Sequence, residues 1–340
     1  MAGHLDVPST VENISGVLGR GGYEGIQADS DGNLWIVEDV GGRNGTVNNR
    51  ARQPNSFIFR FVPSDTTDLT AGGKLQVLAV KSKAHAGDIV FNNPVPDVDI
   101  LSQDVRDLHT YGLVFETRWI TIRDTAVDGS TPFDANLLAK GKGTPFKRPE
   151  NGVFRPGTEF REFYFTETGD TNGQTQAGST FGGFGGLFKI SQHRPSHDQG
   201  TLALFYLGDV SHTGLDNIAF FTNDLLISVE DVGDTLHAQR NALDSAYLFS
   251  VHTDYSNPAN QPIRILAQGR DPSATIDSGL LGTTGFQNDG DNEITGFHVS
   301  DGDPTPVRRH VAGVLHPAAW RQCHVRDHSE SLRRRSRRRL

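Results

Sequence analysis

The stretch from Glu24 to Gly42, EGIQADSDGNLWIVEDVGG, has a second copy in the chain, DNIAFFTNDLLISVEDVGD, which runs from Asp216 to Asp234. The two copies align without a gap at a constant offset of 192 residues, and both contain the run VEDVG. Each copy begins with an acidic residue, continues into a short apolar segment and a turn, and ends its second apolar segment in an acid. Recurrent hairpins with long-period self-similarity indicate radial repetition, as in β-propellers.

Two further segments extend the repeat. ENGVFRPGTEFREFYFTETG, from Glu150 to Gly169, is a looser copy with a longer turn, and DNEITGFHVSDGD, from Asp291, matches the opening of a fourth copy. The turn residues 29–33 are typical of a hairpin, and the apolar run 34–37 predicts a strand buried on both faces. Independent stacked sandwiches are the alternative, but they would not explain acids at equivalent strand ends. We therefore predict an all-β, multi-bladed propeller whose last blade is incomplete.

Other strands and one helix can be placed from local pattern. The helix is expected at 133–140, FDANLLAK, with Asp134 as its N-cap. Helices should otherwise be few and short. Further strand pairs are expected at 56–61 with 75–80, 186–190 with 202–206, and 246–251 with 264–267.

The body of the chain is acidic. The whole sequence carries a net charge of −9, but residues 1–306 hold 22 basic and 39 acidic side chains, or −17. This balance argues against nucleic acid as a partner and suits a protein that binds cations. No apolar window reaches the ~18–20 residues of a membrane helix, so no membrane span is expected.

The segment 307–340 differs in character from the rest. It carries ten arginines, no lysine and Cys323, which is the single cysteine of the chain. It is interpreted either as a basic arm that binds polyanions or as the product of a shifted reading frame, and we favour the second interpretation. The predicted organisation is an N-terminal segment 1–20, a propeller domain 21–306 and this Arg-rich tail.

The acids at repeated strand ends are the candidate functional residues. They are Glu24, Glu38, Glu150, Glu167, Asp216, Glu230 and Glu293. Equivalent positions of different blades converge on the central channel of a propeller, where clustered carboxylates would repel one another. A hard divalent cation removes that conflict, so the pattern predicts an all-oxygen site for Ca²⁺, with Asn217 and backbone carbonyls completing the shell. For any single acid, turn formation or solvation is the simpler interpretation.

Three runs carry a resemblance to a known family. TPFKRPENGVF begins at Thr144, FYFTETGD at Phe163 and LDNIAF at Leu215. Together with the two VED segments, they resemble the PhoX family of bacterial alkaline phosphatases over roughly residues 22–303. The resemblance implies a calcium-dependent phosphomonoesterase on a six-bladed propeller, exported to the periplasm or medium, with calcium and Fe³⁺ at its centre and a small phosphate ester as substrate.

The resemblance also implies roles for single residues. Arg148 would contact the phosphoryl oxygens of the substrate, Glu150 and Asp216 would ligate metal, and Glu38 would do so by its place at a strand end. Arginine's planar fork suits phosphate, and metal ions neutralise charge. A salt bridge between Arg148 and Glu150 is the alternative reading of that pair.

Departures from the family pattern qualify these expectations. The cysteine that ligates iron in the family has no counterpart in residues 1–306, so the sequence gives no support for Fe³⁺. The N-terminus, MAGHLDVPSTVENISG, has neither a basic nor an apolar signal region, so either the protein is cytosolic or its true start lies upstream. These departures leave open whether the chain as written is active.

Three functions remain in competition. The first is a calcium-dependent phosphatase, and the second is another propeller hydrolase, such as a lactonase, in which calcium polarises a carbonyl. The third is a non-catalytic propeller stabilised by calcium. A phosphatase requires a cationic group beside the metal, and Arg148 supplies one. We expect a monomer.

Overall fold

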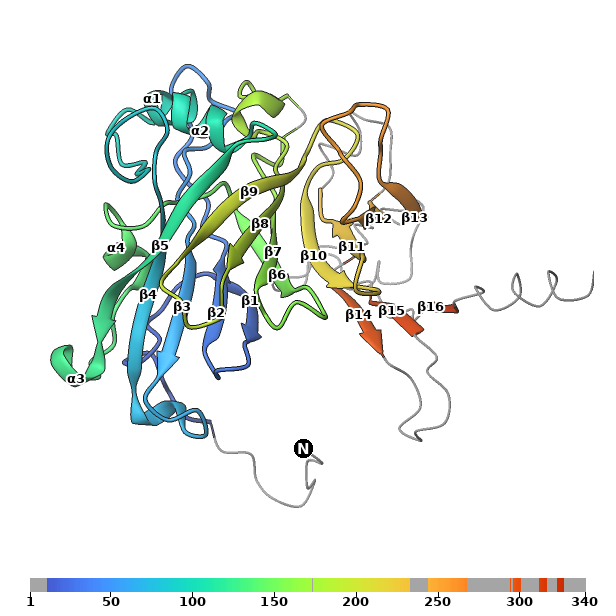
Figure 1. The fold of residues 1–340 in the computed structure, drawn as a ribbon. Coiled ribbons are helices and arrows are strands. Elements are labelled where there is room, and N and C mark those ends of the chain that lie inside the picture. The colour runs from blue at the N-terminus through green and yellow to red at the C-terminus, as the bar shows by residue number, and fades with distance from the viewer. Residues whose placement is uncertain are drawn as a thin grey trace, which may run out of the picture.

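The computed structural model describes residues 11–172, 174–232, 244–267, 294, 296–300, 312–316 and 323–326. Strands dominate this part of the chain, and its helices are few and short (Figure 1). Within the described ranges, no helix is long and apolar enough to cross a membrane. The predicted all-β fold with few short helices is confirmed.

Two four-stranded blades lie in one nine-stranded sheet of order β1-β2-β3-β4-β5-β9-β8-β7-β6. The first blade comprises β1 (Tyr23–Ala28), β2 (Leu34–Glu38), β3 (Ile58–Pro63) and β4 (Gly73–Val80). The second comprises β6 (Pro149–Phe154), β7 (Glu162–Glu167), β8 (Gly186–Gln192) and β9 (Gln199–Leu207). Consecutive strands pair antiparallel, as hairpin-connected strands do.

A third blade and a smaller sheet follow. The third blade comprises β10 (Leu215–Phe220), β11 (Leu225–Glu230), β12 (Ser245–Ser250) and β13 (Ile263–Ala267). The smaller sheet comprises β14 (Gly296–Ser300), β15 (Ala312–His316) and β16 (Cys323–Arg326), of which the last two belong to the Arg-rich segment 307–340.

The inner strands of these units contact one another in turn: β1 with β6, β6 with β10, and β10 with β14. This is the radial arrangement of a propeller. The described residues supply three four-stranded blades and a three-stranded sheet toward the six blades that the family resemblance implies. Glu293, the acid of the fourth sequence copy, lies outside the described residues.

A long strand, β5 (Val114–Asp124), joins the first two blades. Its N-terminal part pairs with β9, where Val114 lies opposite Ala203, and the rest pairs with β4, where Asp124 lies opposite Lys74. The outer strands of two blades are therefore hydrogen-bonded to the same strand, and Figure 1 shows β5 running along both.

The apolar core lies between the blades. Along β2, Trp35 and Val37 face the cluster shared with the second blade, whereas Ile36 faces a cluster shared with residues 14–18 and 133–139. This alternation confirms that the run 34–37 is buried on both faces. A third cluster, which includes Tyr164 and Phe220, fills the space between the second and third blades.

The helices lie in the connections between strands. The predicted helix is present as α4 (Ala135–Ala139), and the Asp134 side chain accepts from Leu137 N as its N-cap. Two helices in the long connection between β4 and β5 were not predicted: α1 (Pro96–Ile100) and α2 (Gln103–Leu108). The remaining helical elements are α3 (Thr125–Asp128), η1 (Leu69–Ala71) and η2 (Ser179–Phe181).

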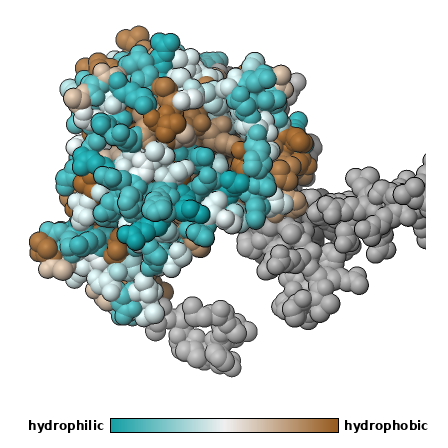
Figure 2. Space-filling model, viewed as in Figure 1, coloured by the Kyte–Doolittle hydropathy of each residue, from teal (hydrophilic) through white to brown (hydrophobic). Residues whose placement is uncertain are grey.

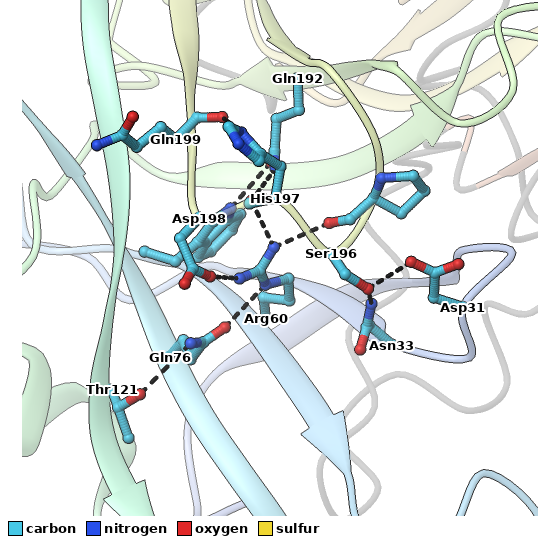
Figure 3. A network of polar contacts seen from close by, with 12 residues as sticks. Asp31, Asn33, Arg60, Gln76, Thr121, Gln192, Ser196, His197, Asp198 and Gln199 are labelled. Carbon is cyan, nitrogen blue, oxygen red and sulfur yellow. Dashed lines mark hydrogen bonds and ion pairs between the residues drawn. The ribbon is translucent and has the colours of Figure 1, made fainter.

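A buried arginine fixes the turn between β8 and β9 to the first blade (Figure 3). Arg60 on β3 is 1% exposed, donates to the carbonyl oxygens of Pro195 and His197 at 2.8 and 2.9 Å, and forms an ion pair with Asp198. Ser196 of the same turn hydrogen-bonds residues of the β1–β2 turn. The two blades are therefore joined by polar contacts as well as by apolar packing.

The surface is mostly hydrophilic in the view of Figure 2, with separate small apolar areas. The exposed apolar side chains include Val98 on α1, Val127 on α3 and Ile263 on β13, each more than half exposed. Scattered apolar side chains of this kind are ordinary on a protein surface and need no partner.

Candidate functional site

Each inner strand of the three blades carries an acid in a β-bulge at the same position. The acids are Glu24 on β1, Glu150 on β6 and Asp216 on β10, each the second residue of its strand. In all three pairs, two inner-strand residues face one residue of the neighbouring strand at this point. Bulges re-aim side chains and are common beside active sites. The repeat in the sequence thus corresponds to a repeated irregularity at one end of the adjacent inner strands.

A second set of acids ends the neighbouring strands. Glu38, Glu167 and Glu230 are the last residues of β2, β7 and β11, and all three are buried. Each lies opposite the first residue of its inner strand. This register brings the two acids of each blade to the same end of the sheet.

The carboxylates of this second set accept backbone N–H groups. Glu167 Oε1 accepts from Lys147 N at 2.6 Å, and Glu230 Oε1 accepts from Thr213 N at 3.1 Å. Lys147 and Thr213 occupy the same position, two residues before the inner strand begins. In the first blade, Glu38 Oε2 accepts from Phe57 N and from the Asn136 side chain. These acids therefore hold the backbone at the strand ends, and their predicted role as metal ligands stays a prediction.

One backbone hydrogen bond recurs at the entry to each inner strand. Its donors and acceptors are Asp39 N to Gly22 O, Thr168 N to Arg148 O, and Asp231 N to Gly214 O, at 2.7, 2.8 and 2.8 Å. Arg148 thus occupies a position that is glycine in the other two blades. It has a φ of +60°, close to the +63° of Gly214. A non-glycine residue pays a conformational cost of about 1–2 kcal/mol in this region.

The side chain of Arg148 lies among the acids. Its Nε and Nη2 donate to both oxygens of Asp39, at 3.0 and 2.8 Å, and Nη2 lies 3.3 Å from Glu150 Oε1. Nη1 also donates to Thr171, whose φ of +51° is unusual for a β-branched residue. The predicted pair of Arg148 with Glu150 is present, but Asp39 holds the guanidinium in a bidentate fashion.

Electrostatics in this cluster reflect crowded carboxylates. Burial, followed by the nearby charge of Asp39, raises the pKa of Glu150, although Arg148 and a hydrogen bond from Thr168 oppose the shift. Burial and Asp39 likewise raise the pKa of Glu24. Burial alone would lower the pKa of Arg148, but its acidic neighbours outweigh that effect and raise it.

The third inner-strand acid, Asp216, is hydrogen-bonded to two asparagine side chains in series. Asn217 Nδ2 donates to Asp216 Oδ1 at 2.9 Å, and Asn151 Nδ2 donates to Asn217 Oδ1 at 2.9 Å. The next acid, Asp231, is near enough to raise the pKa of Arg148. Across the described residues, no group of three or more His, Cys, Asp or Glu side chains is arranged to hold a metal ion.

Sequence reasoning missed Asp39, although the signal was present. The run VED occurs twice, and the second acid of each run, Asp39 or Asp231, is as regularly placed as the first. In the second blade the same position is Thr168, which donates to Glu150 Oε1 at 2.8 Å. A residue-by-residue alignment of the three copies would have identified this position.

Comparison with known proteins supports the fold. No protein family model matches the chain, and neither does any curated protein sequence. A solved structure of PhoX from Pseudomonas fluorescens, in complex with vanadate, a transition state analogue, superposes with a TM-score of 0.52 at 15% sequence identity. The match covers 89% of this chain and 50% of PhoX, so the chain spans about half the length of that protein. The chain has a PhoX-like propeller fold, as predicted.

Proposed function

We propose that this chain is a calcium-dependent phosphomonoester hydrolase of the PhoX type, with its centre at the inner-strand bulges. The observation that carries the proposal is the position of Arg148, a strained arginine among bulged acids where the other blades have glycine. Strain of this kind is retained where the surrounding structure enforces it, often at functional sites. The PhoX structure of similar fold contains vanadate, an oxyanion as phosphate is, which supports a site for a phosphoryl group.

The donor set for Ca²⁺ would be the bulged acids Glu24, Glu150 and Asp216, together with Asp39. Carboxylate oxygens are the ligands that this hard cation prefers. Burial, followed by the charge of Asp39, raises the pKa of Glu24 and of Glu150, and a cation among these carboxylates would favour their charged forms. Bound Ca²⁺ would neutralise these carboxylates and polarise a phosphoryl group. Iron is not part of the proposal.

Arg148 would bind the phosphoryl oxygens. Its planar guanidinium offers parallel N–H groups that match phosphate as well as carboxylate. Asp39 occupies that fork in the structure. Substrate therefore has to displace the Asp39 carboxylate, and this exchange becomes favourable when a cation holds Asp39 instead. Bound calcium should therefore increase the affinity for phosphate, and bound phosphate should increase the affinity for calcium.

Hydrolysis of p-nitrophenyl phosphate with calcium or with EDTA tests the proposal. We expect turnover only with calcium, none for Glu150→Gln, and a large loss for Arg148→Lys, because an ammonium group cannot replace the bidentate fork. Glu116→Gln, at an exposed side chain on β5, is the control and should behave as wild type. Hydrolysis of a lactone instead would favour the lactonase-like alternative. Calcium binding without turnover of either ester would favour a binding propeller.

A further inference from the structure

The residue before Arg148 is tied down by a buried ion pair. Lys147 and Asp170 are 2% and 3% exposed, and Lys147 Nζ lies 3.1 Å from Asp170 Oδ1. Asp170 also accepts from Arg52 N at 3.0 Å and from the Thr175 hydroxyl. Removing one partner of such a pair costs about 3–5 kcal/mol, because the other charge is left buried and uncompensated.

The backbone around Arg148 is fixed from the same side. Residues at the end of β7 and in the turn after it hydrogen-bond the backbone of Lys147 and Arg148. Glu167 accepts from Lys147 N. Thr168 N donates to Arg148 O, and Gly169 N donates to Lys147 O. The segment 147–148 therefore has a partner for its first N–H and for both of its carbonyl groups. These contacts oppose a return of Arg148 to negative φ.

Glu167 is itself held by a histidine from an inserted helix. His109, the C-cap of α2, is 4% exposed, and its Nε2 lies 2.7 Å from Glu167 Oε2. The other ring nitrogen, Nδ1, donates to Val105 O at 2.7 Å, which fixes the ring orientation. Its ring meets Phe188 edge-on. Through His109, the long connection between β4 and β5 thus contacts the carboxylate that binds Lys147 N before β6.

The third blade has glycine at the position of Arg148. There the equivalent residues are Thr213 and Gly214, and the same two backbone contacts are made to Glu230 and Asp231. Glycine adopts positive φ without penalty, so Gly214 requires no further restraint. In the second blade the residue at this position is strained, and the Lys147–Asp170 ion pair and His109 support the segment that contains it.

We propose that Lys147, Asp170, Glu167 and His109 are positioning residues that hold Arg148 in its left-handed conformation and so direct its guanidinium at the bulged acids. The consequence for substrate rests on the proposed function, but the placement of Arg148 does not. None of the four needs to touch the substrate for this role.

The test uses Lys147→Met combined with Asp170→Asn, which removes the pair without leaving a buried charge. Modification of Arg148 by phenylglyoxal, followed by mass spectrometry, reports whether the guanidinium leaves its acidic partners. We expect several-fold faster modification in the double variant. For p-nitrophenyl phosphate with calcium, kcat/KM should fall about 10–100-fold, mainly through KM, as is typical when groups that orient a site are lost.

Two controls separate positioning from general loss of stability. Arg60→Met removes the buried arginine of Figure 3 and its hydrogen bonds to the turn between β8 and β9, and should destabilise the fold while leaving Arg148 modification unchanged. His109→Gln keeps a donor toward Glu167 and should resemble wild type, whereas His109→Phe should resemble the double variant.

The outcomes are distinguishable. Unchanged Arg148 modification in the folded double variant overturns the positioning role, as does an equal increase in Arg60→Met. If modification changes as expected but the wild-type protein neither hydrolyses the ester nor binds inorganic phosphate with calcium, the positioning role stands and the proposed function fails.

Discussion

Arg148 combines an unfavourable backbone conformation with a favourable charge environment. The positive φ costs about 1–2 kcal/mol. The partly exposed ion pair with Asp39 stabilises the fold by about 1 kcal/mol at most. Its neighbours Asp39 and Glu150 would repel each other without the guanidinium between them. The net effect of Arg148 on stability should therefore depend on whether another cation is present.

Replacing Arg148 with glycine should expose this dependence. We expect Arg148→Gly to unfold at a urea concentration equal to or above that of wild type in calcium, because strain is relieved, and below it in EDTA. Glu159→Gly, at an exposed residue with a φ of +54°, is the matched control and should gain stability in both conditions. Equal destabilisation of Arg148→Gly in calcium and EDTA would contradict the account.

Glu38 should make stability depend on pH. Its burial raises the pKa to about 7 from an ordinary 4.5, although hydrogen bonds from Asn136 and Phe57 N oppose the shift. The folded state therefore holds this proton more tightly than the unfolded state does. The stabilisation is complete below pH 4.5 and is lost as pH rises toward 7, by an amount on the order of 3 kcal/mol.

The comparison of Glu38→Gln with wild type checks this. Urea unfolding in EDTA between pH 4.5 and 8 should show a flatter dependence for the variant, while Glu116→Gln, at an exposed side chain, should follow wild type. Parallel curves for all three proteins would assign the pH dependence to other groups.

At the scale of elements, the β1–β2 hairpin depends on one buried carboxylate. Asp29 accepts from Asp31 N and Asn33 N in the turn, and from the Asn33 and Trp35 side chains. It thereby satisfies the indole N–H of a tryptophan that is packed between two blades. The turn and the core are linked through this side chain.

Asp29→Ala should therefore be costly for a turn mutation. We expect a loss of about 3 kcal/mol in the free energy of unfolding, because three buried donors on Asn33 and Trp35 lose their acceptor. Asp65→Ala removes similar local bonds from an exposed turn and should cost less than about 1 kcal/mol. Similar losses for both variants in urea unfolding would show that the contact to Trp35 contributes little.

The sequence predicted those elements whose signals are local. Hairpins marked by turn residues, the run 34–37 and the capped helix at Asp134 are all present. The two helices between β4 and β5 were missed because each is only five or six residues long, which is too short for a helical period to be recognised in the sequence. The double pairing of β5 depends on contacts between distant segments, which no local pattern encodes.

The candidate site divides in the same way. The repeat located the acids of the inner strands, since position within a blade is a property of the sequence copy. The roles of Asp39 and of the support formed by Lys147 and His109 follow from side-chain directions and from an insertion outside the repeat. These side-chain contacts form only when the blades pack against one another, so no local sequence pattern predicts them.

For the whole molecule, the acidic character of the body predicts a response to cations. A ligand that binds only the folded state at 100 times its Kd stabilises it by about 2.7 kcal/mol. We expect calcium to raise Tm relative to EDTA, and Glu150→Gln to lose most of the increase. An equal Tm in calcium and EDTA would remove the cation from the centre of the fold.

Strand β5 has a consequence for how the molecule comes apart. Because it is hydrogen-bonded to the outer strands of two blades, neither blade can open its edge without breaking pairs that belong to the other. Hydrogen exchange should therefore find one cooperative unit from β1 to β9, with amides that lose protection together, while the amides of β10 to β13 exchange through a separate and lower-energy opening.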